Sequence, residues 1–101
     1  MSVAVATIDD VGALSDVPAL SVTDGGAVSH TVSADKKGVV FINTGEEICW
    51  FGGSTVDADA GRGILLLPRV YFIWRNASSD FKVYFQCTTG LSTTVSLCEY
   101  A

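Results

Sequence analysis

The sequence is poor in charged side chains, and basic residues are the scarcest of them. Only 17% of its 101 residues are charged, against about 25% in an average soluble domain. Six Lys and Arg residues stand against eleven Asp and Glu residues, for a formal net charge of −5. Apart from Lys36 and Lys37, the basic residues are scattered. Phosphate backbones and anionic bilayers are bound by clustered Lys and Arg, so we expect no direct contact with nucleic acid or a membrane.

Long apolar runs and secretion signals are also missing. No segment approaches the roughly 20 apolar residues that a spanning helix needs. The opening residues, MSVAVATIDD, lack the basic region with which a signal peptide begins. The three cysteines, Cys49, Cys87 and Cys98, therefore indicate free thiols in a protein made in a reducing cytosol. A Cys49–Cys87 disulfide between neighbouring strands is the alternative.

Catalytic and metal-binding motifs are absent as well. His30 is the only histidine, no CxxC or GxSxG is present, and Glu46 and Glu47 are adjacent in a turn, where their carboxylates point apart. Residues 57–61 carry two aspartates spaced as at the start of a calcium loop, but the remaining ligands are missing. We expect a protein without enzymatic activity, cofactor or metal, in which 57–61 is a solvated turn; calcium binding there is the alternative.

What the sequence does contain is a series of short β-strand patterns separated by turn residues. Residues 28–33 alternate apolar and polar side chains, and Val39–Ile42 is a continuous β-branched and aromatic run. Asn43-Thr44-Gly45 is typical of a turn. Strands are expected at 21–23, 28–33, 39–42, 48–51, 64–67, 71–74, 81–87 and 93–99. Seven to eight strands at this spacing predict an all-β fold, a single antiparallel β-sandwich or small barrel.

The first twenty residues differ from the rest of the chain. They contain no aromatic and no basic residue, and Asp9, Asp10, Asp16 and Pro18 interrupt their small apolar side chains. Neither a strand nor a helix period is clear there. We interpret residues 1–20 as an extended N-terminal arm or edge strand, and residues 21–101 as the β-sandwich domain.

Aromatic residues are more numerous than one inner sheet face can hold. In the pairs Trp50-Phe51 and Tyr71-Phe72, adjacent rings must point to opposite faces of a strand. Some rings should therefore reach the surface as anchors for a protein partner. The candidates are Trp50, Tyr71, Trp74 and Tyr84, together with Arg62, which a loop tip could present to an anion or a carboxylate. The alternatives are rings in the core and an ordinary surface arginine.

Three segments of the sequence together resemble a known pattern. FINTGEEICWFGGSTV (41–56), GRGILLLP (61–68) and FKVYFQCTTGLSTTVSLCEY (81–100) are similar to small β proteins encoded among the structural genes of tailed bacteriophages. The resemblance implies a β-sandwich or barrel module of the virion: a head decoration or cement protein, a head–tail joining protein, or a part of the tail. The chain departs from the pattern at Arg69, where glycine is commoner, and in its free cysteines.

We therefore expect a non-enzymatic virion protein, and we favour a capsid decoration or cement subunit. It would bind the major capsid protein or other virion proteins and its own copies, with residues 1–20 ordering on assembly and the 57–63 loop forming a second contact. The alternatives are a head–tail joining or tail protein, and a host-surface module that binds carbohydrate through Trp50 or Trp74.

Overall fold

Eight strands in two antiparallel sheets make up the fold of this computed structural model, which describes residues 14–33, 35–75 and 82–100. The first sheet has the order β1 (Leu14–Val22), β8 (Thr93–Tyr100), β3 (Gly38–Asn43), β6 (Tyr71–Arg75). The second has the order β2 (Val28–Thr31), β7 (Lys82–Gln86), β4 (Cys49–Gly52), β5 (Ile64–Leu66). The predicted all-β sandwich is confirmed, and the sheets do not close into a barrel.

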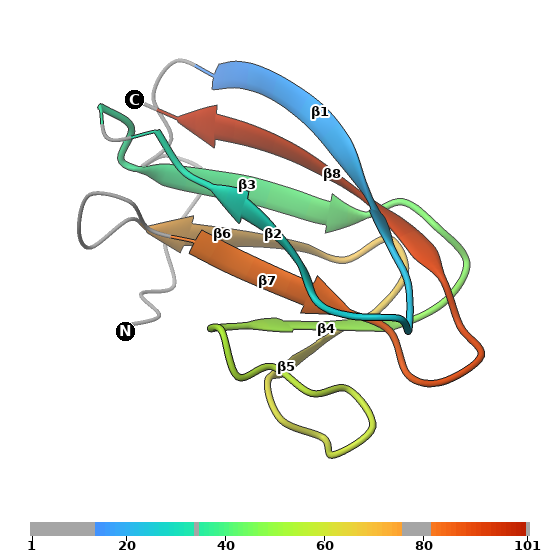
Figure 1. Cartoon of the computed structure of the whole chain (residues 1–101). Coiled ribbons are helices and arrows are strands. Elements are labelled where there is room, and N and C mark those ends of the chain that lie inside the picture. Colours follow the sequence, from blue (N-terminus) through green and yellow to red (C-terminus); the bar gives the residue numbers. More distant parts are fainter. Residues whose placement is uncertain (1–13, 34, 76–81, 101) are drawn as a thin grey trace.

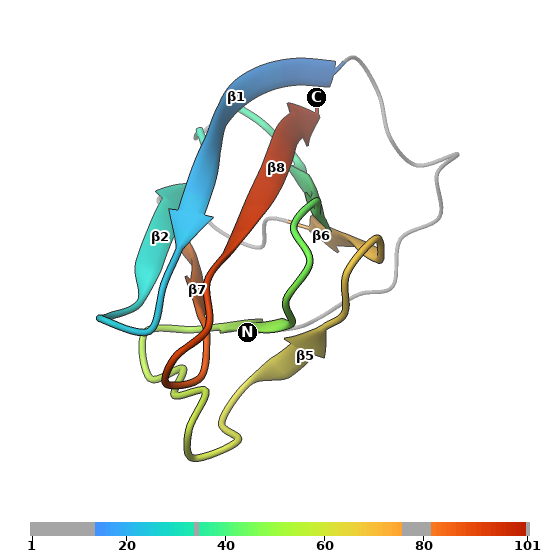
Figure 2. The same cartoon turned by 90° about the vertical axis from the view of Figure 1, so that its right-hand side faces the viewer.

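The strand order is that of a double Greek key, or jelly roll. Every connection crosses from one sheet to the other except β4 to β5, which is a local hairpin. As a result β1 and β2 form one lateral side of the sandwich, while β5 and β6 form the opposite side (Figures 1 and 2). These four are the edge strands of the two sheets.

Aromatic rings fill the space between the sheets. Phe41 lies at the centre, with ring centroids 4.8 Å from Phe51, 5.1 Å from Phe85, 5.8 Å from Phe72 and 6.3 Å from Trp74. Edge-to-face and offset pairs at these distances add to the free energy gained by burial. The predicted inward side chains Val83, Phe85 and Cys87 are all buried, which confirms the alternation in β7; Phe81 lies outside the described residues.

Trp74 corrects one of the surface predictions. Its side chain is only 1% exposed, so it is a core residue and not a surface anchor. The reason is strand phase: Trp74 pairs with Val39 and shares the inner face of β6 with Phe72. In the sequence Tyr-Phe-Ile-Trp both faces of the strand are apolar, so periodicity alone does not show which face is covered.

The predicted boundary between arm and domain falls inside a strand. Residues 14–20 belong to β1, which continues to Val22 and pairs with β8. The register shifts between Val17 and Leu20, where Pro18 has no N–H to donate. This irregularity hides the strand from a test for strict alternation. The part of the arm prediction that concerns residues 1–13 lies outside the described residues.

One buried amide ties the two sheets together at the end of the sandwich where β3 stops. Asn43 is 0% exposed. Its Nδ2 donates to the carbonyl oxygens of Glu47 (2.8 Å) and Leu66 (3.1 Å). Its Oδ1 accepts from the N–H of Gly45 (3.1 Å) and the hydroxyl of Thr93 (2.7 Å). The side chain thus links the end of β3 to the following turn, to the end of β5 and to the start of β8.

The backbone of Asn43 holds the connection from β5 to β6. Its N–H donates to the Val70 carbonyl (3.3 Å), and its carbonyl accepts from the Arg69 N–H (2.8 Å). Residues Leu67 to Val70 form a turn with proline second and a positive φ of 67° at Arg69, as in a type II turn. A positive φ explains why glycine is expected at position 69.

We expect Asn43→Ala to destabilise the protein by about 2–4 kcal/mol, because it leaves two carbonyls, an N–H and a hydroxyl without partners. Urea unfolding followed by tryptophan fluorescence measures the change. Thr44→Ala, which removes one exposed hydrogen bond to the Thr94 carbonyl, is the control and should cost less than about 1 kcal/mol. Equal stability of the two variants would contradict the role given to Asn43.

Candidate functional site

The nearest approach to acid–base chemistry is a histidine–carboxylate pair between the sheets. His30 on β2 and Glu99 on β8 face inward, and Nε2 of His30 lies 2.7 Å from Oε2 of Glu99. The side chains are 16% and 5% exposed. The same carboxylate oxygen accepts from the Ser33 N–H (3.2 Å). The pair closes the sandwich on the side formed by β1 and β2.

The order of these groups does not fit nucleophilic catalysis. A serine nucleophile must contact the imidazole that removes its proton. Here Ser33 and His30 both contact Glu99, so the carboxylate stands between them. Burial raises the pKa of Glu99, but the hydrogen bonds from Ser33 and His30 and the charge of His30 outweigh burial and hold that pKa below its ordinary value of 4.5. The arrangement stabilises an ionised carboxylate that joins two sheets.

The three cysteines are free thiols. Cys49 and Cys87 are both buried. Cys49 lies on the inner face of β4, and Cys87 directly follows β7, the strand that pairs with β4. Burial, and to a smaller extent electrostatic repulsion from Cys87, raises the pKa of the Cys49 thiol to about 12. A thiol with so high a pKa is a poor nucleophile, and the alternative of a Cys49–Cys87 disulfide is not realised.

The loop between β4 and β5 packs back onto the protein. Val56 and Ala58 are buried, and the Ala58 N–H donates to Oε1 of Gln86 on β7 (2.9 Å). The two carboxylate oxygens of Asp59 accept from the N–H (2.9 Å) and hydroxyl (2.7 Å) of Thr89, and these bonds lower the pKa of Asp59. The aspartate needed by the calcium alternative is therefore engaged within the protein. No group of three His, Cys, Asp or Glu suited to a metal ion occurs among the described residues.

The remaining predicted anchors lie in different places. Trp50 and Tyr84 are half-buried on the outer face of the second sheet; Tyr84 lies opposite Gly52, two residues from Trp50. Arg62 is exposed in the loop before β5, paired through its backbone with Asp57. Tyr71 is 57% exposed at the start of β6. The structure therefore does not gather the predicted anchors into one site.

Tyr71 instead belongs to an apolar surface that the sequence analysis missed. Among the described residues, five of the six exposed large apolar side chains fall between positions 64 and 71. We call this surface the β5–β6 rim: Ile64 (40% exposed), Leu65 (42%), Leu67 (47%), Val70 (44%) and Tyr71 (57%). It follows the two edge strands on one side of the sandwich (Figure 2).

The signal for the rim was present in the run Ile64-Leu65-Leu66-Leu67. Consecutive apolar side chains point to both faces of a strand, so a strand covered on one face must expose some of them. Only Leu66 is buried. Periodicity predicts a strand at residues 64–67 but no surface role for it, because its edge position depends on the order of the strands in the sheet.

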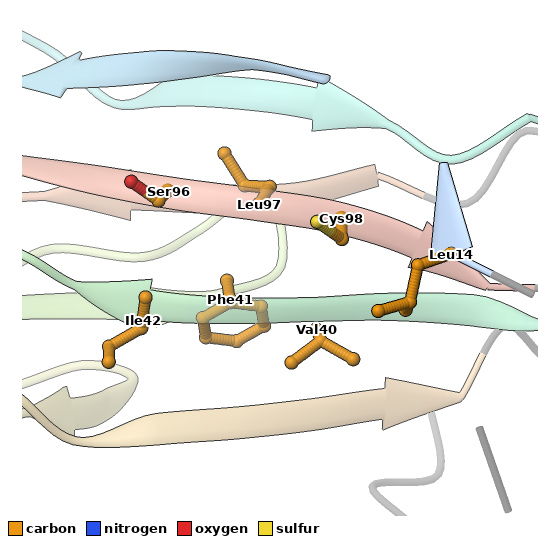
Figure 3. A pocket seen from close by; sticks show the side chains of 7 residues that line it. All are labelled: Leu14, Val40, Phe41, Ile42, Ser96, Leu97 and Cys98. Atoms are coloured by element: carbon orange, nitrogen blue, oxygen red, sulfur yellow. The ribbon is translucent and has the colours of Figure 1, made fainter. Parts of the chain in front are cut away.

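A second apolar feature is a shallow groove on the first sheet. It has a volume of about 180 Å³ and is lined from β1, β3 and β8 by Leu14, Val40, Phe41, Ile42, Ser96, Leu97 and Cys98 (Figure 3). Small-molecule sites combine apolar walls with a few convergent polar groups. The polar side chains here are Ser96 and Cys98, and the thiol of Cys98 contacts Oδ1 of Asp16 (3.3 Å). The groove thus lacks the polar anchors of a ligand site.

Comparison with protein-family models, with curated proteins and with solved structures finds no match to this chain. The described residues also form no helix long and apolar enough to cross a bilayer. A function for this protein is therefore inferred from its fold and its surface.

We expect the Glu99 carboxylate to make stability depend on pH on the acid side. A pKa lowered by folding stabilises the folded state above the pKa of the unfolded chain, and this contribution is lost as pH falls through the folded pKa. At pH 7, Glu99→Gln should cost about 1–2 kcal/mol. Chemical unfolding from pH 7 to pH 3 should show this difference shrinking below about pH 4.5.

Glu46→Gln is the matched control, because the Glu46 side chain is 89% exposed and lies 3.5 Å from Arg69. Its stability should follow that of the unaltered protein across the range. A gap between Glu99→Gln and the unaltered protein that stays constant down to pH 3 would contradict the assignment.

Proposed function

We propose that the protein is a non-enzymatic structural subunit that binds protein neighbours through the β5–β6 rim. The observation that carries the proposal is the concentration of exposed apolar side chains in one short segment: five of them within eight residues. Contiguous exposed apolar surface on a soluble protein is typical of an interaction site. Tyr71 adds the aromatic side chain that most often dominates binding energy in such sites.

The position of the rim on edge strands supports the same conclusion. Proteins usually protect free strand edges with lysines, prolines, bulges or covering loops. Between Ile64 and Tyr71 the one charged residue is Arg69, whose side chain is bound to the Thr44 carbonyl and to Glu46, and Pro68 comes only after β5 has ended. An apolar edge left in this condition favours association with another chain.

Within this class we propose a virion role, as a capsid decoration or cement subunit that contacts the major capsid protein and its own copies. Two considerations support it: the resemblance of segments 41–56, 61–68 and 81–100 to tailed-phage structural proteins, and the jelly-roll fold, which viral capsid domains and lectins share. The second is an analogy of fold, which does not by itself assign a function. A particle repeats each contact many times, so even a small rim gains avidity.

A carbohydrate-binding role has less support. Binding to a sugar ring requires an exposed aromatic face, but Trp74 is buried and Trp50 is half-buried. The indole Nε1 of Trp50 is itself buried and has no hydrogen-bond partner among the described residues. Head–tail joining and tail roles would use the rim in the same way as decoration.

We expect the double variant Leu67→Asp/Tyr71→Asp to abolish association, because it places two carboxylates in an apolar contact of a protein that already carries a net charge of −5. Sedimentation velocity over a range of concentrations measures the assembly state. Leu14→Asp is the control: Leu14 is 58% exposed, but it lies on β1 at the other side of the sandwich. Loss of assembly in the control alone would contradict the assignment of the rim.

The virion role has its own test. Particles produced from the genome that encodes this chain should contain it in many copies after density-gradient purification, as measured by quantitative mass spectrometry. Particles made with the Leu67→Asp/Tyr71→Asp variant should contain at least about tenfold less, since each 1.4 kcal/mol of lost binding is a factor of ten. Particles that lack the unaltered chain would rule out a decoration role.

A further inference from the structure

We propose that residues 2–10 of a second copy add a strand to the free edge of β5, with Asp9 and Asp10 facing Arg62. This inference rests on the proposed function, because it names the neighbour that covers part of the β5–β6 rim. Four observations carry it: an unpaired edge, an apolar segment with the properties of a strand, complementary charges, and the reach of the chain.

The edge of β5 is available. In the described residues β5 pairs with β4 alone, in the register Cys49↔Leu66, Trp50↔Leu65, Phe51↔Ile64. Its other edge is the border of the second sheet. An extended segment bound there gains main-chain hydrogen bonds from the edge and apolar contacts from Ile64 and Leu65, the usual mode of strand addition.

The segment that suits this edge is at the beginning of the chain. Residues 2–8, Ser-Val-Ala-Val-Ala-Thr-Ile, are small or β-branched and carry no charge. Such residues favour an extended strand and fit against a narrow apolar rim. Asp9 and Asp10 follow directly, so the apolar part of the segment ends in two negative charges.

Arg62 provides the complementary charge. It precedes β5 by two residues, and no hydrogen bond or ion pair joins its guanidinium to another described residue. If the segment runs antiparallel to β5, its C-terminal end lies beside the start of β5, where Arg62 is located. Arg69, beyond the other end of β5, is already bound to the Thr44 carbonyl and to Glu46, so Arg62 favours the antiparallel direction.

The reach of the chain selects a second copy over the same copy. Asp10 and Leu14 are four residues apart, which spans at most about 14 Å. β1 and β5 are at opposite sides of different sheets, separated by three strand spacings (about 14 Å) and one sheet spacing (about 10 Å). Even the direct line of about 17 Å, which passes through the core, exceeds that reach. An antiparallel strand on β5 of the same copy would need the backbone of Asp10 beside the start of β5, farther from Leu14 than this reach, so we infer that a second copy provides the segment.

A contact between the arm of one copy and the edge of the next is heterologous, so it builds rings or open chains and not closed two-fold dimers. This property gives a complementation experiment. One full-length chain carries Ile64→Asp/Leu65→Asp on the acceptor edge and keeps its arm; the other lacks residues 2–10 and keeps its rim. Each alone should be monomeric. An equimolar mixture should form a 1:1 heterodimer that grows no further, as measured by light scattering after size exclusion.

The control mixture pairs the arm-deleted chain with a chain that combines the arm deletion with the substitutions on the acceptor edge. It should stay monomeric because neither partner has an arm. Arg62→Asp in the arm-deleted chain should weaken the heterodimer roughly fivefold at low salt. Asp9→Arg/Asp10→Arg in the other chain should restore it. Restoration distinguishes a direct charge pair from a general loss of stability.

The outcomes separate the inference from the proposed function. Assembly of the arm-deleted chain alone, to the same extent as the unaltered protein, would overturn the inference and leave the rim as an interface. Binding of the protein to particles without any self-association would likewise overturn the inference and leave the rim as an interface. Association that persists in the rim variant would overturn both, and would point to the groove beside Leu14 as the interface instead.

Discussion

The structure depends on the hydrogen bonding of one buried amide, that of Asn43. A buried amide without partners costs far more than each of its hydrogen bonds contributes, so the groups around Asn43 are fixed relative to one another. They come from β3, from the turn after it, from the end of β5 and from the start of β8. Both sheets are represented, and the backbone of Asn43 also fixes the turn between β5 and β6. Phe41 and the rings around it then fill the space between the two sheets, and the Asn43 hydrogen bonds close one end of that space.

The two lateral sides of the sandwich differ as a consequence. On the side of β1 and β2, the inward pair of His30 and Glu99 joins the sheets through a 2.7 Å contact between their side chains. On the side of β5 and β6, the fixed turn directs Leu67, Val70 and Tyr71 into solvent. A protein with few charged residues has little else with which to cover such a surface, and this asymmetry is the basis for the proposed assembly.

The sequence was sufficient for what depends on local periodicity. Strands β2 to β8, the inward side chains of β7 and the turn after Asn43 follow from alternation and turn residues, whereas the irregular β1 does not. Trp74 could not be placed, because both faces of its strand are apolar and only pairing with Val39 decides between them. The contact of His30 with Glu99 joins residues 69 positions apart, and the rim depends on which strands are at the edges. Both need the strand order, which periodicity does not encode.

Amide hydrogen exchange of the full-length protein, at concentrations on both sides of its association, tests the central claim most directly. The account predicts that residues 64–71 exchange slowly in the assembled state and faster in the dilute state, while β2 at residues 28–31 shows no such difference. Exchange at residues 64–71 that is independent of concentration in an associating sample, or protection confined to β1 and β2, would contradict it.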